Sequence, residues 1–321
     1  MKIYQTKENT YISEILNEIC QTVFSKKITN LLDINSELDS TKCIVNIDKN
    51  TLYIKFSSVQ DFIKKDYDIK WVLQDLNISL QPISFGFLKS FELYYSIFNY
   101  NNVSLYEEEK IEASSILNSV INFYSIKLER NNNIGTAKDF FLKRYVFDNF
   151  YSCFPESLKE DFLNLTCTYG EMYEKLQLEI KNYNLIGDEN ILLHGNLGER
   201  SIANCEENIC LYNFENSFYG HPAIDVCLLD INLKLNKSSF LQKSFPLEGL
   251  NLDNLLYSYK ACLLKKACDF IFDIIFKYFA KEINSKDKLV KNFLDLTFYS
   301  QIEEINLIKD SISNIINHSN V

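Results

Sequence analysis

The sequence predicts an α+β fold with two lobes, a small β-rich lobe over residues 1–100 and a larger, mainly helical lobe over residues 101–321. Apolar residues alternate with a period of two in much of the first part and recur at helical spacing in most of the second. A short hairpin pattern at 191–225 interrupts the helical part and contains two of the three histidines and three of the eight glycines. With 321 residues, of which 46% are apolar, the chain can bury a sizeable core.

The elements of the first lobe follow from these two spacings. The pattern predicts a helix, three strands, a second helix and two further strands, at 10–25, 28–34, 43–47, 52–56, 59–76, 83–88 and 91–100. In the third strand, Leu52, Ile54 and Phe56 share one face, and Tyr53 and Lys55 share the other. The second lobe is predicted to hold helices at 105–128, 137–154, 155–185, 226–235, 252–281 and 288–316.

Composition and charge exclude several classes of partner. The net charge of −10, from 33 basic and 43 acidic residues, opposes binding to nucleic acid or to an anionic membrane surface, and no basic patch offsets it. The N-terminus lacks an apolar signal core, and no apolar run approaches the roughly 20 residues needed to span a bilayer. We therefore expect a soluble protein made in the cytoplasm.

The cysteines form an odd and dispersed set of nine. Cys205 and Cys210 are separated by four residues, but no matching second pair completes a zinc site. Most of the cysteines are therefore predicted to be small buried hydrophobic residues in a reducing compartment.

The hairpin region carries a recognisable pattern. It reads His194-Gly195-Asn196-Leu197, then Tyr212-Asn213-Phe214-Glu215, then Gly220-x-Pro222-x-x-Asp225-Val226. This order and spacing resemble the signature of the aminoglycoside phosphotransferase and choline kinase superfamily, to which bacterial spore-coat proteins also belong. The family has His-Gly-Asp-Leu with an Asn five residues after the Asp, then Ile-Asp-Phe/Trp-Glu, then Gly-x-Pro-x-x-Asp-Leu. The resemblance covers essentially the whole chain and implies a protein-kinase-like fold.

The resemblance also implies which positions would carry phosphoryl transfer. In the family, the Asp of His-Gly-Asp orients the attacking hydroxyl, and the later Asn and Asp hold Mg²⁺; the corresponding residues here are Asn196, Ser201 and Asn213. An amide cannot act as a general base, and Mg²⁺ is bound mainly through carboxylates and phosphates. The three substitutions together therefore predict that catalysis has been lost.

Of the nucleotide-binding features that the resemblance implies, a lysine is present but a glycine-rich loop is missing. Lys55 stands where the family has its phosphate-pairing lysine, with Asp66 or Asp68 of the next helix in reach of it; otherwise it is an exposed strand lysine. No glycine precedes Gly86, although a loop that cradles phosphate needs close approach of backbone N–H groups. Bound ATP and Mg²⁺ are therefore expected only if the protein is active.

The remaining motif residues are predicted to shape the backbone. His194 and Gly195 would form the loop, Gly220 and Pro222 the following turn, and Asp225 would cap the next helix or tie it to the loop. Glu199 and Glu215 are the carboxylates that could replace the missing acids; otherwise Glu215 is a solvated loop residue.

The sequence thus favours a catalytically degenerate, pseudokinase-like protein that serves a structural or binding role in the spore coat. Its partners would be other coat or structural proteins, and its heavy use of Asn, Lys and Ile is typical of an AT-rich, spore-forming bacterium. The alternative is an active ATP-dependent kinase of a small hydroxylated or amine-bearing molecule. A third reading is a decayed paralogue without a ligand.

Overall fold

A computed structural model describes residues 2–36, 40–74, 78–105, 113–125, 134–182, 191–198, 201–205, 208–233 and 252–279. The chain forms two compact units, one made of residues 1–134 and 194–217, the other of residues 135–193 and 218–321. The predicted lobes follow one another along the sequence, whereas these units are interleaved, because segment 194–217 groups with the N-terminal residues.

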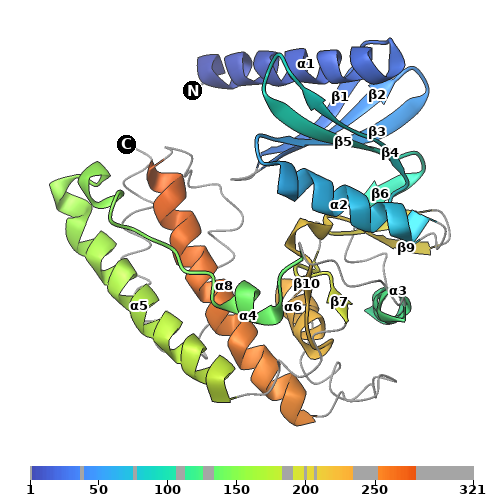
Figure 1. Cartoon of the computed structure of the whole chain (residues 1–321). Helices are drawn as coiled ribbons and strands as arrows, with labels where there is room; N and C mark the ends of the chain where they lie inside the picture. Colours follow the sequence, from blue (N-terminus) through green and yellow to red (C-terminus); the bar gives the residue numbers. More distant parts are fainter. Residues whose placement is uncertain are drawn as a thin grey trace. The chain divides into compact units, whose positions relative to one another are not determined.

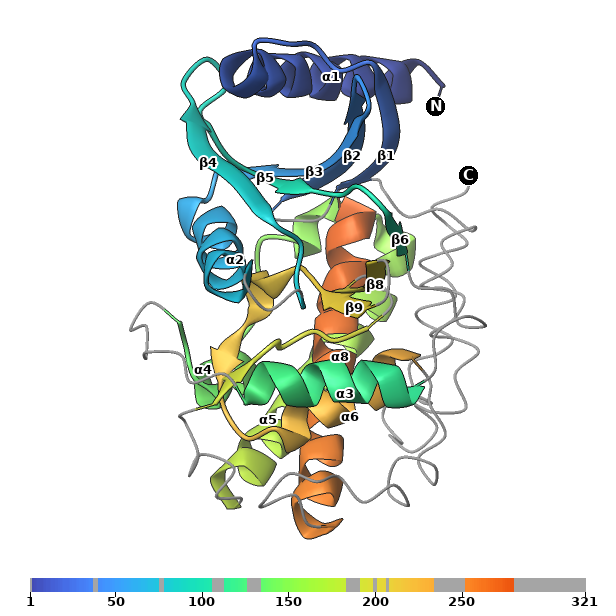
Figure 2. The same ribbon diagram turned by 90° about the vertical axis from the view of Figure 1, so that its right-hand side faces the viewer.

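The first unit is built on an antiparallel sheet of five strands in the order β1-β2-β3-β5-β4. The strands are β1 (Asn30–Ser36), β2 (Thr41–Ile47), β3 (Asn50–Ser57), β4 (Pro82–Leu88) and β5 (Leu93–Asn99). Helix α1 (Lys2–Phe24) covers one face of this sheet and α2 (Gln60–Leu73) lies against the other (Figures 1 and 2). The predicted order of helix, three strands, helix and two strands is confirmed.

The two faces of β3 pack into different clusters, as its alternation predicts. Leu52, Ile54 and Phe56 join the apolar residues of α1 in one core cluster. Tyr53 belongs to a second cluster on the other face, together with Phe98. The apolar stripe on each element therefore explains why the sheet lies between two helices.

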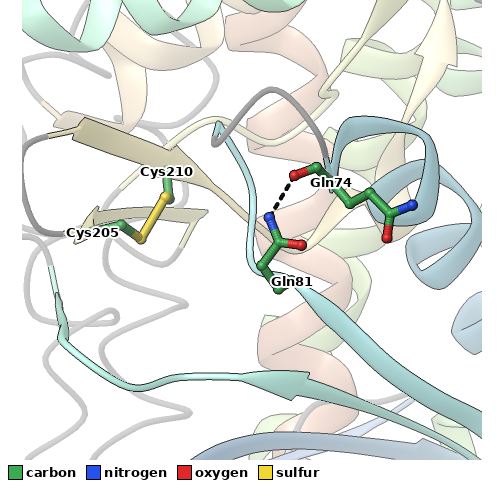
Figure 3. Close-up of a disulfide and its surroundings, with 4 residues drawn as sticks. All are labelled: Gln74, Gln81, Cys205 and Cys210. Carbon is green, nitrogen blue, oxygen red and sulfur yellow. Dashed lines mark hydrogen bonds between the residues drawn. A yellow bond between two sulfur atoms is a disulfide. The ribbon is translucent and has the colours of Figure 1, made fainter.

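A smaller sheet completes the first unit. Strands β6 (Val103–Leu105), β8 (Ile202–Cys205) and β9 (Asn208–Leu211) pair in the order β6-β8-β9, and helix α3 (Ala113–Tyr124) lies nearby in the same unit. Cys205 and Cys210 form a disulfide across the β8–β9 hairpin, with their Cα atoms 5.9 Å apart (Figure 3). This pair is an exception to the prediction, which concerns most of the cysteines. The free cysteines Cys20, Cys43, Cys227, Cys262 and Cys268 are buried, whereas Cys167 is exposed.

The second unit is mainly helical. Its helices are α4 (Ala137–Phe141), α5 (Lys159–Asn182), α6 (Ala223–Leu233) and α8 (Leu252–Phe279), and its two short strands, β7 (Leu192–Leu193) and β10 (Phe218–Tyr219), pair antiparallel. Helix α8 packs against both α5 and α6. Among the described residues, no helix is both long and apolar enough to cross a bilayer.

The predicted helix over 137–154 is wrong beyond its first turn. Helix α4 begins with a capping box at Thr136 but ends at Phe141. The Tyr145 N–H donates to the Tyr169 hydroxyl at 2.8 Å, and the Tyr145 hydroxyl donates to Asp269 at 2.7 Å. These contacts to α5 and α8 hold the segment after α4 in an irregular path, so tertiary packing outweighs local propensity. The predicted helix at 288–316 lies outside the described residues.

Candidate functional site

The loop after β7 is shaped around a fully buried histidine. The His194 Nε2–H donates to the Tyr212 carbonyl at 2.8 Å, and Nδ1 accepts the Asn196 N–H at 3.3 Å. The next residue, Gly195, has a φ of 80°, in the left-handed region that glycine adopts without strain. Burial lowers the pKa of His194 to about 4, so the imidazole is neutral near pH 7. Its contacts make His194 a residue that fixes the loop backbone.

Ser201 closes the same loop. Its hydroxyl accepts the Gly198 N–H at 2.8 Å and lies 3.0 Å from both the Asn196 and the Gly198 carbonyl oxygens, to which it can donate. The side chain of Ser201 is therefore engaged with the loop backbone. Asn196 is exposed, and its side chain ends in a neutral amide.

Asn213 lies at the end of β9 in the left-handed region, with a φ of 67°. Its side-chain oxygen accepts a hydrogen bond of 2.6 Å from the Tyr53 hydroxyl, and the residue is buried. The following N–H, that of Phe214, donates to Asp66 Oδ1 of α2 at 2.8 Å. The segment after β9 is thus held to β3 and α2 by polar contacts on the face of the sheet that carries Lys55.

Five charged side chains meet on this face, and we call them the buried charge network: Lys42, Lys55, Asp66, Lys70 and Glu215. Glu215 accepts from Lys42 at 2.8 Å and from Lys55 at 2.6 Å. Asp66 in turn contacts Lys55 at 3.3 Å and Lys70 at 3.0 Å. Each of the five is less than 7% exposed, so the ion pairs are shielded from solvent. Three ammonium groups thus face two carboxylates in the described structure.

The lysines determine the ionisation of the two acids. Burial by itself raises the pKa of Glu215, but Lys55 and Lys42 outweigh it and hold the pKa well below its usual range. Asp66 shows the same balance between burial and its lysine partners, and its pKa is lowered. Burial also lowers the pKa of Lys70 to about 8, against the opposing effect of Asp66. The ammonium of Lys70 lies 3.6 Å from the centre of the Phe98 ring, a cation–π contact.

The structure revises three expectations about these residues. Lys55 lies on β3 as predicted, but it is fully buried and so is not an exposed strand lysine. Its acidic partner is Asp66; Asp68 instead pairs with Lys64 at 2.5 Å on the exposed side of α2. Glu215 is not a solvated loop acid, because the two lysines hold it in the interior. Glu199 lies outside the described residues.

Sequence reasoning missed Lys42 and Lys70, although each carried a signal. Lys42 stands directly opposite Lys55 on neighbouring strands, a like-charge pair that is unfavourable without an anion between the two ammonium groups. Lys70 follows Asp66 by four residues on one helix, a spacing that brings the two side chains together. Both signals require the strand register or helix face to be known first.

The remaining motif residues belong to the second unit. The Gly220 N–H donates to the Ile191 carbonyl at 3.0 Å, and a Cβ at position 220 would come within 3.0 Å of the Ala137 Cβ, so this close packing favours glycine. Pro222 immediately precedes α6, and its carbonyl accepts the Val226 N–H at 3.2 Å. Asp225 lies buried in the first turn of α6.

The start of α6 has a second polar contact. His221 Nδ1 accepts the Ala223 N–H at 3.1 Å, which satisfies one of the N–H groups that a helix leaves unpaired at its beginning. Among the described residues, no group of three or more His, Cys, Asp or Glu side chains could hold a metal ion.

Comparison with solved structures identifies the fold. An aminoglycoside phosphotransferase, APH(4)-Ia in a thermostable apo form, matches with a TM-score of 0.54 at 11% identity, over 94% of this chain and 98% of its own. Choline kinase LicA from Streptococcus pneumoniae gives 0.54 at 10% identity, over 95% and 99%. The chain has the fold of these phosphotransferases. Spectinomycin phosphotransferase APH(9)-Ia, solved with ADP and spectinomycin, gives 0.53 at 9% identity, over 94% and 98%.

The predicted kinase-like α+β fold is thereby confirmed, and the match extends over nearly the full length of each chain. Neither a family model nor a curated protein matches the sequence. At about one identical residue in ten, it is the fold alone that these proteins share with this one.

Proposed function

We propose that this phosphotransferase-fold protein is catalytically degenerate and acts through binding or assembly. One observation carries the proposal: the Lys55 ammonium has no exposed surface and lies 2.6 Å from the Glu215 carboxylate. Enzymes of this kind use such a lysine to pair with nucleotide phosphates. Here a carboxylate of the chain itself takes the place of that anion.

The contacts of Glu215 oppose nucleotide binding. A phosphate could reach Lys55 only by displacing Glu215, which would also remove the 2.8 Å contact between Glu215 and Lys42. A displaced carboxylate would then need another cation or solvent. The lysines of the charge network are therefore already paired with carboxylates of the chain, and ATP does not fit the residues present.

The residues at the family's metal positions fit Mg²⁺ no better. Mg²⁺ needs near-octahedral oxygen ligands with carboxylates among them. Ser201 offers a hydroxyl already bonded within its loop, and the carbonyl oxygen of Asn213 already accepts from Tyr53. Asn196 adds no base for the attacking hydroxyl. At the positions that the family uses, the chain thus lacks a catalytic base, carboxylate ligands for the metal and a lysine available to phosphate. Together these losses support the proposal that the protein is catalytically degenerate.

Nucleotide binding can be tested by thermal denaturation with ATP, with Mg²⁺, and with both. We expect no rise in melting temperature at millimolar nucleotide, since a ligand that bound the native state would stabilise it increasingly as the ligand concentration rises above its Kd. A Mg²⁺-dependent rise that Lys55→Met abolishes and Lys64→Met retains would overturn the proposal. Lys64 suits as the control because it lies on the exposed side of α2.

An active small-molecule kinase is the second candidate, and the contact between Lys55 and Asp66 favours it. A lysine on the third strand that pairs with an acid of the following helix is a requirement of active kinases. ATP and Mg²⁺ would then be cofactors, with Glu215 or Glu199 in place of the missing acids and a hydroxylated or amine-bearing molecule as substrate. Substrate-dependent release of ADP would distinguish this candidate from a degenerate protein.

For the degenerate protein we propose a place in the spore coat, among other coat or structural proteins. Among proteins that share the hairpin motif, the spore-coat subgroup is the one in which a structural role makes sense, and the Asn-, Lys- and Ile-rich composition also supports this role. A fluorescently tagged copy, followed through sporulation, should collect around the developing spore. A diffuse signal that is already present in vegetative cells and does not redistribute would rule out the coat.

A further inference from the structure

Strand β4 is one edge of the five-stranded sheet and pairs with β5 alone in that sheet (Figure 2). Its sequence, Pro-Ile-Ser-Phe-Gly-Phe-Leu, contains no charged residue. Edge strands are usually protected by charges, because their unpaired backbone groups are a template for another strand. The opposite edge, β1, contains Asp33, and both edge strands have an irregular register, β1 between Leu31 and Asp33 and β4 between Pro82 and Ser84. The two edges therefore differ in charge, since β1 contains one charged residue and β4 contains none.

Aromatic rings continue from this edge onto α2. We call them the aromatic strip: Trp71, Tyr67, Phe85, Tyr94 and Phe87. Successive ring centres are 6.1, 5.8, 6.5 and 4.7 Å apart, so the five rings form one continuous surface. The two end residues are the most open, with Trp71 50% and Phe87 49% exposed.

Two aliphatic residues of the same elements are also open to solvent, Val72 of α2 at 53% and Ile83 of β4 at 39% exposure. A large aromatic side chain buries 150–250 Å² when fully covered, so Trp71 and Phe87 each leave on the order of 100 Å² uncovered. Contiguous apolar surface next to an unpaired strand edge is typical of an interaction site.

We propose that the edge is covered by a second copy of this chain, whose β4 pairs antiparallel with the first and joins the two sheets. The occupant follows from the strand itself. Backbone pairing at an edge requires a strand, and antiparallel pairing of two identical strands generates a closed two-fold dimer. Because β4 is uncharged, the two copies bring no like charges together despite the net charge of −10 on each chain.

The proposed pairing places Gly86 on the two-fold axis, at the centre of the uncharged segment 84–88 of β4. Phe85 and Phe87 are two positions apart and lie on the face of the sheet that contacts α2. With Gly86 opposite its own copy, Phe85 of each strand faces Phe87 of the other, and the two aromatic strips become continuous. Aromatic pairs of this kind are among the cross-strand contacts that stabilise sheets.

Sedimentation velocity over a wide concentration range tests the dimer. The wild-type chain should shift from monomer to dimer as concentration rises, and Phe87→Lys should remain monomeric but folded, because Phe87 is half exposed. Leu32→Lys is the matched control: Leu32 is 51% exposed on the other edge strand, so its variant should still dimerise.

Hydrogen exchange adds a readout specific to strand pairing. The backbone amides of β4 should exchange more slowly at high than at low protein concentration, while those of β1 should not change. A chain that stays monomeric at every concentration would overturn the proposal. So would a dimer that Phe87→Lys leaves intact, or one that forms without slowing exchange in β4.

Discussion

Replacing Glu215 by alanine is expected to lower the free energy of unfolding by about 3–5 kcal/mol, the cost of removing one partner from a buried ion pair. The carboxylate separates the ammonium groups of Lys42 and Lys55, which stand opposite each other on neighbouring strands. Without it, two buried positive charges face one another, and only Asp66 remains to balance Lys55. Urea denaturation near neutral pH measures the loss.

Asp68→Ala supplies the control for this measurement. Asp68 and Lys64 form an ion pair in the same unit, but the Asp68 side chain is 41% exposed and the pair is one helical turn apart. Such pairs contribute about 0.3–0.5 kcal/mol. If Glu215→Ala costs no more than Asp68→Ala, the charge network does not stabilise the fold. The combined variant Lys42→Met with Glu215→Gln should recover part of the loss, because it also removes one of the two facing charges.

The N-terminal half of the fold was predictable because its elements are amphipathic in isolation. The alternation in β3 assigned Leu52 and Ile54 to one face and Tyr53 and Lys55 to the other before any pairing was known. Strand β6 was missed, since Val103–Leu105 is too short to show a period and is a strand only because it pairs with Ala203–Cys205. Tertiary contact therefore decides the shortest elements.

The candidate site was predictable where it is local and not where it is assembled by folding. The resemblance to a known motif assigned Asn196, Ser201 and Asn213, which all lie within one short stretch of the sequence. The sequence motif did not reveal the buried charge network, because Glu215 is 173 residues from Lys42 and 160 from Lys55. No spacing rule connects residues so far apart.

The sequence contained enough information to predict that Asp66, and not Asp68, pairs with Lys55. Asp66 shares a helical face with the buried Ile63 and Lys70, which lie three residues before it and four after it, whereas Asp68 is two positions round the helix. The helical face, and not proximity in sequence to Lys55, selects the acid that enters the interior.

Acid is expected to destabilise the fold first through His194. The pKa of this buried imidazole is about 4, whereas an unfolded histidine has a pKa of about 6.5. Between these values the unfolded chain binds a proton that the native chain does not, so the free energy of unfolding falls as the pH falls. The shift corresponds to a loss on the order of 3 kcal/mol by the lower end of this window.

The acids of the charge network act in a lower pH range. The pKa values of Glu215 and Asp66 are depressed, so the stability they supply is present above their unfolded values near 4 and is lost only as the pH falls further. A loss of stability between pH 6.5 and 4.5 is therefore assigned to His194 and not to the acids.

His194→Gln tests this assignment, because glutamine can still donate to the Tyr212 carbonyl but does not titrate. Urea denaturation at a series of pH values should show the wild-type free energy of unfolding falling between pH 6.5 and 4.5 more steeply than that of the variant. The variant is expected to be less stable at pH 7, since glutamine fills less of the space against Phe214, and to approach the wild type as the pH is lowered. Parallel curves would mean that His194 binds its proton over the same pH range in the native and the unfolded chain. The loop would then hold a charged imidazole below about pH 6.5, although a protonated Nδ1 cannot accept the Asn196 N–H.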